Sequence, residues 1–104
     1  MKYFVSYTTI DKEITKEFLY QFSNELKKYG EAFIDMLDNN SSDKQLRIIY
    51  EIDSSDMLIL IDTKSIYQSK WVLLEIERAR GKEKPIQKIS VNDILNNNFQ
   101  HIIK

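Results

Sequence analysis

The sequence contains no cysteine, one histidine, one proline and two glycines. The absence of cysteine excludes disulfides, thiolate catalysis and cysteine-based zinc sites. With His101 as the single histidine, pairs of histidine ligands are excluded and a Ser/His/Asp triad is disfavoured. So few glycines and prolines leave no room for a flexible linker. For 104 residues we therefore expect one domain over residues 1–104 with a single core.

Excess charge and long apolar runs are also absent. Fifteen basic and sixteen acidic residues give a formal net charge of −1, so no overall field attracts nucleic acid or an anionic membrane. No run approaches the roughly 20 apolar residues that span a bilayer. The N-terminal MKYFVSY lacks the apolar segment and cleavage site of a signal peptide. We expect a cytoplasmic protein that binds neither nucleic acid nor membrane.

Short runs rich in β-branched and aromatic residues alternate with segments of helical spacing along the chain. The expected strands are 2–7, 31–37, 57–61 and 85–90. The expected helices are 11–29, a second from a Ser42–Gln45 capping box to residues 53–55, a third over 69–80, and a short one in the tail, which leaves room for a fifth, edge strand. Gly30 is expected to end the first helix and Ser69 to begin the third.

Each of the three longer helices carries an apolar stripe that is expected to face the core. The stripes are Ile14, Phe18, Phe22 and Leu26; Leu46, Ile49 and Ile52; and Val72, Ile76 and Ala79. The alternation of strands and helices predicts a small doubly wound α/β fold, a flavodoxin-like parallel sheet of four or five strands flanked by helices. The nearly continuous apolar run at 57–61, MLILI, is typical of a strand covered on both faces.

In this strand order the winding reverses between the first and third strands, and ligands bind outside the carboxyl ends of those strands. The segments that leave these two ends are 6–9 and 62–75. Both are rich in polar side chains. We therefore expect a pocket lined by these two segments.

Several segments, taken in order, resemble TIR (Toll/interleukin-1 receptor) domains over residues 2–90. The first strand reads Phe4-Val5-Ser6-Tyr7, and Asp11 follows as an acidic residue that opens the first helix. Ser55-Asp56 precedes the apolar third strand, which is followed by a stretch from Tyr67 to Glu75 with a W-x-x-x-E pattern and then by a Pro-Ile strand. Val72 stands where a cysteine is common, and the loop DNNSS lacks the Pro-Gly of the longer loop that many TIR domains use in assembly.

The resemblance implies an NAD⁺ glycohydrolase or cyclase that cleaves the nicotinamide–ribose bond, in microbial defence or signalling. In TIR domains that cleave NAD⁺, the glutamate of the W-x-x-x-E pattern is catalytic, and Glu75 is the matching residue. One carboxylate is sufficient for this chemistry. The nicotinamide ring is a cationic pyridinium while it is bound to ribose and departs as a neutral molecule, so no general acid is needed to protonate it. NAD⁺ is then a substrate, and no cofactor or metal is expected, since Asp35, Asp38 and Asp43 are too dispersed for Mg²⁺.

Five residues are candidates for substrate binding: Ser6, Tyr7, Thr8, Trp71 and Tyr67. Ser6 and Tyr7 lie at the mouth of the first strand, Thr8 is placed to contact phosphate, Trp71 is an aromatic wall beside Glu75, and Tyr67 is placed at the rim. Structural alternatives stay open for each: strand termination, helix capping, or packing under a turn. For Glu75 the alternative is a surface ion pair with Arg78, worth about 0.2–0.5 kcal/mol.

Two other classes of function also fit the sequence. One is a non-enzymatic TIR-like module that binds a protein or a nucleotide, with a homo-oligomer or another TIR-like or effector protein as partner. The other is a different flavodoxin-like nucleotide binder, such as a relative of the deoxyribosyltransferases, which also place a carboxylate at an N-glycosidic bond. The sequence lacks the glycine-rich loop of mononucleotide and NTPase sites.

Overall fold

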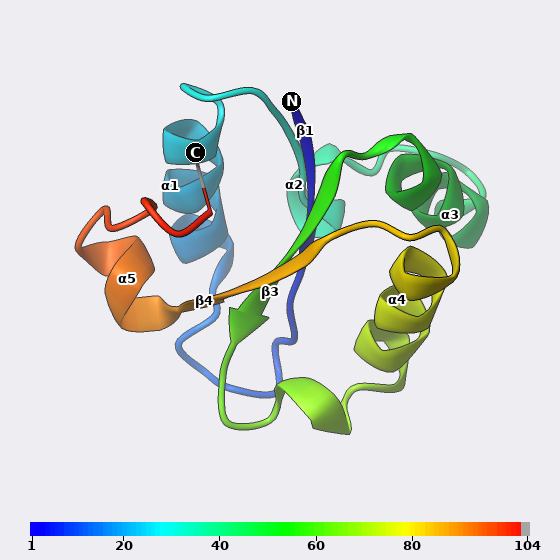
Figure 1. Cartoon of the computed structure of the whole chain (residues 1–104). Helices are drawn as coiled ribbons and strands as arrows, with labels where there is room; N and C mark the ends of the chain where they lie inside the picture. Colours follow the sequence, from blue (N-terminus) through cyan, green and yellow to red (C-terminus); the bar gives the residue numbers. More distant parts are fainter. Residues whose placement is uncertain (103–104) are drawn as a thin grey trace.

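A computed structural model describes residues 1–102 and contains a four-stranded, all-parallel sheet in the order β2-β1-β3-β4 (Figure 1). The elements are, in order, β1 (Lys2–Ser6), α1 (Lys16–Leu26), β2 (Glu31–Phe33), α2 (Asp35–Asp38), α3 (Lys44–Ser54), β3 (Met57–Asp62), a 3-10 turn (Ile66–Gln68), α4 (Lys70–Gly81), β4 (Ile86–Ser90) and α5 (Val91–Leu95). The order of strands and the parallel pairing confirm the doubly wound, flavodoxin-like prediction.

Helices cover both faces of the sheet: α1 and α5 lie on one side, and α3 and α4 lie on the other (Figure 1). Successive side chains of β3 enter these two cores in turn, because a strand points its side chains to alternate faces. Ile59 and Ile61 belong to the α1 side, and Leu58 and Leu60 to the α4 side. All four are at most 1% exposed, which confirms a strand covered on both faces.

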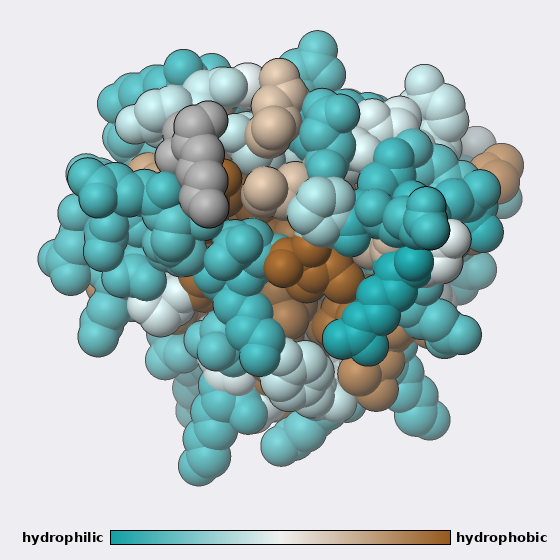
Figure 2. Space-filling view, in the orientation of Figure 1, coloured by the Kyte–Doolittle hydropathy of each residue, from teal (hydrophilic) through white to brown (hydrophobic). Residues whose placement is uncertain are grey.

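The face of the molecule drawn in Figure 2 is mostly hydrophilic. In Figure 2, hydrophobic side chains gather near the centre of the view, where the edge strand β4 crosses the front of the sheet in Figure 1. Hydrophilic side chains surround this patch. Within residues 1–102, none of the helices has the length and hydropathy needed to cross a membrane.

Helix α1 is shorter than the predicted helix over 11–29. The Thr15 side chain accepts a hydrogen bond from the Phe18 N–H at 3.1 Å and fixes the first turn there. Asp11 therefore precedes the helix instead of opening it. Its carboxylate accepts a hydrogen bond from the Ser65 N–H at 2.9 Å, in the loop after β3. Local periodicity in the sequence does not predict this long-range hydrogen bond.

Gly30 does not end α1, contrary to prediction, because the helix stops at Leu26 and is capped by Lys27. A close approach of two chain segments explains the glycine. A Cβ at Gly30 would lie 2.2 Å from the Met1 carbonyl oxygen, and that same oxygen accepts a hydrogen bond from the Glu31 N–H at 2.9 Å. Only a residue without a side chain allows β2 to begin beside β1 in this way.

The second predicted strand, 31–37, is also too long. β2 ends at Phe33, and Asp35–Asp38 forms one helical turn, α2. The Asp38 carboxylate accepts a hydrogen bond from the Ile34 N–H at 2.8 Å, which turns the chain out of the sheet. The following helix, α3, is capped by Asp43, whose side chain accepts from the Leu46 N–H at 3.1 Å, and not by the predicted Ser42.

The predicted apolar stripe of α3 is only partly correct. Ile52 is 2% exposed, but Leu46 is 63% exposed and Ile49 is 40% exposed. Two successive three-residue steps spread Leu46, Ile49 and Ile52 over about 120° around the helix, whereas one four-residue step rotates by only about 40°. The packed face of α3 is formed by Ile48 and Ile52, which are four apart and contact the α4-side core.

The stripe of α4 is confirmed, since Val72, Ile76 and Ala79 are at most 6% exposed. In the first stripe Phe18, Phe22 and Leu26 are at most 9% exposed on α1, whereas Ile14, although buried, precedes the helix. The tail forms the short helix α5, and Phe99 packs on Phe22 with ring centroids 5.8 Å apart. Residues 96–102 contain turns, so the fifth strand is not formed in the part of the tail that the structure describes; residues 103–104 lie outside it.

Two substitutions on α3 test which of its faces is packed. Ile52→Ala should lower the free energy of unfolding by about 2–4 kcal/mol, because it leaves a cavity in the α4-side core. Leu46→Ala should change it by less than about 0.5 kcal/mol, because Leu46 is mostly in solvent. Urea unfolding of both variants measures the difference. A loss for Leu46→Ala as large as that for Ile52→Ala would contradict the described orientation of α3.

Candidate functional site

Ser6 ends β1 at the point where the winding of the sheet reverses. It lies two residues after Phe4, so both side chains point to the side of the sheet covered by α3 and α4. Its side chain is fully buried. A buried hydroxyl needs a hydrogen-bond partner, and the partner comes from α4.

Helix α4 places Glu75 against Ser6. Ser69 caps the helix as predicted, because its hydroxyl accepts a hydrogen bond from the Val72 N–H at 3.3 Å. The buried stripe of Val72, Ile76 and Ala79 then fixes the rotation of the helix on the sheet. Glu75 flanks this stripe and is partly buried. Its Oε1 accepts a hydrogen bond of 2.6 Å from the Ser6 hydroxyl.

Burial of the Glu75 carboxyl raises its pKa to about 7. The Ser6 hydroxyl opposes this rise, because it donates to the ionised form. The negative charge of Asp35 adds to the rise. A carboxyl group with a pKa near neutrality holds its proton in part of the population and can exchange it, which is typical of groups in functional sites.

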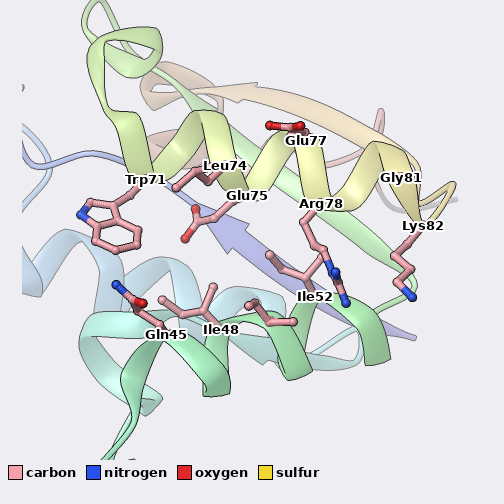
Figure 3. Close-up of a pocket in the computed structure, with 11 residues that line it drawn as sticks. Gln45, Ile48, Ile52, Trp71, Leu74, Glu75, Glu77, Arg78, Gly81 and Lys82 are labelled. Atoms are coloured by element: carbon pink, nitrogen blue, oxygen red, sulfur yellow. The ribbon is translucent and has the colours of Figure 1, made fainter.

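Glu75 lies where two parts of one cleft meet. The first part, about 540 Å³, runs between α3 and α4 and is lined largely by apolar side chains, among them Ile48, Ile52 and Leu74 (Figure 3). The second part, about 430 Å³, lies over the carboxyl end of β1 and is more polar. Trp71 and Glu75 line both parts. In Figure 3 the Glu75 carboxyl points from α4 into the space between the two helices.

Besides Trp71, two of the predicted binding residues, Tyr7 and Thr8, line the polar part. The Tyr7 hydroxyl accepts a hydrogen bond from the Met36 N–H at 3.1 Å, and burial raises the pKa of Tyr7 to about 12. Tyr7 therefore keeps its proton and remains able to donate it to a ligand. Thr8 is 6% exposed, and its hydroxyl accepts from the Ile10 N–H at 3.3 Å. This bond shapes the loop after β1 and leaves the hydroxyl hydrogen of Thr8 uncommitted.

The other predicted residues lie in different surroundings. Trp71 is 55% exposed and flanks Glu75 at the mouth of the cleft. Ser6 is in direct contact with Glu75 but has no exposed surface. Tyr67 lines neither part of the cleft. The ammonium of Lys88 lies 5.4 Å from the centre of the Tyr67 ring, so Tyr67 belongs to the neighbouring surface.

The ion pair between Glu75 and Arg78 is not formed. Arg78 instead donates to Asp53 of α3, with Nε and Nη2 at 2.9 and 2.6 Å from its two carboxylate oxygens. This bidentate pair joins α3 to α4 at the far end of the apolar part of the cleft. The pairing leaves the Glu75 carboxyl without a neutralising cation among its direct contacts in residues 1–102.

Asp35 is a site residue that the sequence analysis did not identify. It begins α2, lines the polar part of the cleft and influences the pKa of Glu75. The available signal was its position directly after β2, since carboxyl ends of neighbouring parallel strands share one edge of the sheet. No cluster of three or more acidic or histidine side chains suited to a metal ion occurs in residues 1–102.

Comparison with known proteins does not add a family to this geometry. A scan against protein-family models gives no match, and a search of curated proteins gives none. The resemblance to TIR domains is therefore carried by the order of the quoted motifs and stays a prediction.

The raised pKa of Glu75 predicts a pH-dependent cost to stability. The unfolded chain releases this proton near pH 4.3, about its reference value, whereas the folded protein releases it near 7. The stabilisation that the proton supplies is complete below about pH 4 and is lost as the pH rises through about 7. Relative to Glu75→Gln, the wild-type free energy of unfolding should fall by on the order of 3 kcal/mol between about pH 4 and pH 8.

Urea unfolding of the two proteins over this pH range measures the effect. Glutamine keeps the shape of the side chain and does not titrate, so the difference between the proteins isolates Glu75. A difference that is independent of pH would contradict the raised pKa.

Proposed function

We propose that this chain is a TIR-like NAD⁺ glycohydrolase or cyclase, with Glu75 as the catalytic residue, acting in microbial defence or signalling. The observation that supports it most directly is the position of Glu75. Its carboxyl lies at the switch point of a flavodoxin-like sheet, in a cleft, beside an exposed tryptophan, with a pKa near 7. Ligands of such sheets bind at this place.

The chemistry of nicotinamide release suits a single carboxylate in this setting. As the bond between nicotinamide and ribose breaks, positive charge builds up on the ribose, and a fixed negative charge stabilises it. The partly buried surroundings of Glu75 strengthen this interaction relative to bulk water. A cationic pyridinium bound nearby also favours the ionised form of Glu75, so the substrate itself shifts the carboxyl toward the reactive state.

The residues around Glu75 fit distinct parts of such a substrate. Trp71 offers an aromatic surface for the nicotinamide ring, and the Tyr7 hydroxyl is a free donor toward a ribose or amide oxygen. Lys44 lines the polar part of the cleft and supplies a positive charge for phosphate.

A non-enzymatic binding module is the second candidate, and exposed apolar side chains favour it. Leu46, Ile49 and Tyr50 on α3, with Trp71 and Leu74 on α4, are between 40% and 63% exposed. Aromatic side chains are enriched at protein interfaces, and the buried centre of an interface is more apolar than the rest of a protein surface. In this case the protein binds a partner and leaves NAD⁺ intact.

Incubation with NAD⁺ tests the enzymatic proposal. The wild type should release nicotinamide, and Glu75→Gln and Glu75→Ala should lower the rate by at least about 100-fold, as loss of a charge-stabilising group does elsewhere. Glu17→Gln is the matched control, because Glu17 is an exposed glutamate on α1, across the sheet from the cleft. Chromatography of the products separates hydrolysis from cyclisation.

Absence of nicotinamide release from the wild type, at high protein concentration and with crowding agents that promote assembly, would overturn the enzymatic proposal. Equal rates in the wild type and Glu75→Gln would overturn the role of Glu75. Capture of a specific partner whose binding is unchanged by Glu75→Gln would then favour the binding module.

A further inference from the structure

The Glu75 carboxyl is influenced by groups from two neighbouring elements that act in opposite directions. Ser6, at the end of β1, donates a hydrogen bond to one of its oxygens at 2.6 Å. Asp35, at the start of α2, lines the same cleft and carries a negative charge. The first interaction favours the ionised carboxylate, and the second favours the neutral acid.

Ser6 acts on a ligand only through Glu75. Its side chain is 0% exposed, so it offers no surface to a molecule in the cleft. The bond to Glu75 joins residues that are 69 positions apart in the sequence. It therefore fixes the rotamer of the carboxyl relative to the sheet, and not merely within its own helix.

Asp35 is itself held in place. Its Oδ1 accepts a hydrogen bond of 2.6 Å from the side-chain amide of Asn39, which is 5% exposed. The Asn39 amide also donates to the Lys44 carbonyl at 3.2 Å. This arrangement keeps the Asp35 carboxylate at the mouth of β1, where its charge also raises the pKa of Tyr7.

We propose that Ser6 and Asp35 are a pair of positioning residues that set the protonation and orientation of Glu75 through opposite effects on its carboxyl group. Ser6 orients the carboxyl and favours its charge, and Asp35 restrains that charge until a cation enters the cleft. The effect on turnover rests on the proposed function, whereas the effect on Glu75 does not.

The other titratable and charged groups around the cleft do not shift the pKa of Glu75, so Ser6 and Asp35 are the residues whose substitution should change it. Tyr7 stays neutral until about pH 12. On α4, Arg78 is paired with Asp53, and Glu77 is exposed. Lys44 and Lys82 line the polar and apolar parts of the cleft, respectively. Neither lysine nor Arg78 is among the groups that shift the pKa of Glu75, so removal of Ser6 or Asp35 should dominate any change.

A titration of the Glu75 side-chain carboxyl by carbon-13 NMR tests the pair without any substrate, with the Glu75→Gln spectrum to assign the signal. Ser6→Ala should raise the titration midpoint by about one unit, since it removes a hydrogen bond to a charged group. Asp35→Asn should lower it by roughly half a unit or more. Asparagine keeps the oxygen that accepts from Asn39.

Ser23→Ala is the matched control for Ser6→Ala. Ser23 is also a buried serine, 2% exposed, but it lies on α1 across the sheet, and its hydroxyl has no hydrogen-bond partner within residues 1–102. This substitution should leave the Glu75 midpoint unchanged. Amide spectra and urea unfolding show whether each variant keeps the fold.

If the Ser6→Ala protein is folded and its Glu75 titration midpoint equals that of Ser23→Ala, Ser6 does not act on Glu75 and the proposal is overturned. The same holds if Asp35→Asn fails to lower the midpoint. If the wild type cleaves NAD⁺, the acid limb of kcat/KM against pH should move upward in Ser6→Ala and downward in Asp35→Asn. A loss of rate that is uniform at all pH values would indicate a structural role only.

Opposite shifts in the NMR titration without any cleavage of NAD⁺ would uphold the action of the pair on Glu75 and overturn only the proposed reaction. The two hypotheses therefore fail separately.

Discussion

The two central strands, β1 and β3, are buried on both faces, so polar side chains are tolerated only where these strands end. Within β1 the residues from Tyr3 to Ser6 are all buried, and Ser6 is the last of them. Its hydroxyl therefore has to be satisfied by a neighbouring element. The helix that covers this end of the sheet supplies a carboxyl group, and this contact defines where the cleft has its polar centre.

Burial of the Glu75 carboxyl group at this contact explains why the site costs stability. A carboxyl group taken partly out of water resists ionisation, and one hydroxyl donor compensates for this only in part. Burial of an uncompensated acid is tolerated in natural proteins mainly where function requires it. The two acids of α3 on this side of the sheet are paired: Glu51 contacts Lys2 at 2.8 Å and Arg47 at 3.1 Å, and Asp53 contacts Arg78. The other acid of α4, Glu77, is exposed to solvent. Glu75 differs from all three, because it is partly buried and, within residues 1–102, has no cation beside it.

Much of the fold could be predicted from local pattern, and the errors have physical causes. The strand at 57–61 and the stripe of α4 were predicted correctly, because continuous apolar runs and four-residue spacing have few interpretations. The ends of helices and strands were harder to predict. Side-chain hydrogen bonds of Thr15, Asp38 and Asp43 decide where elements begin or end, and neighbouring polar residues in the sequence are equally plausible donors or acceptors for such bonds. The outward orientation of Leu46 depended on which face of α3 meets the sheet, and a stripe with three-residue spacing does not fix it.

The sequence by itself determined the class of fold and the cap and buried stripe of α4, since these follow from local periodicity and cap chemistry. The choice of Glu75 came instead from the resemblance of its W-x-x-x-E pattern to TIR domains. Only the tertiary structure decided what surrounds that carboxyl. It brings Ser6 to one side of Glu75, places Asp35 near it, pairs Arg78 with Asp53 instead, and leaves Tyr67 outside the cleft. Hydrogen bonds and burial across such long sequence separations depend on how the helices dock on the sheet, and no local pattern encodes that docking.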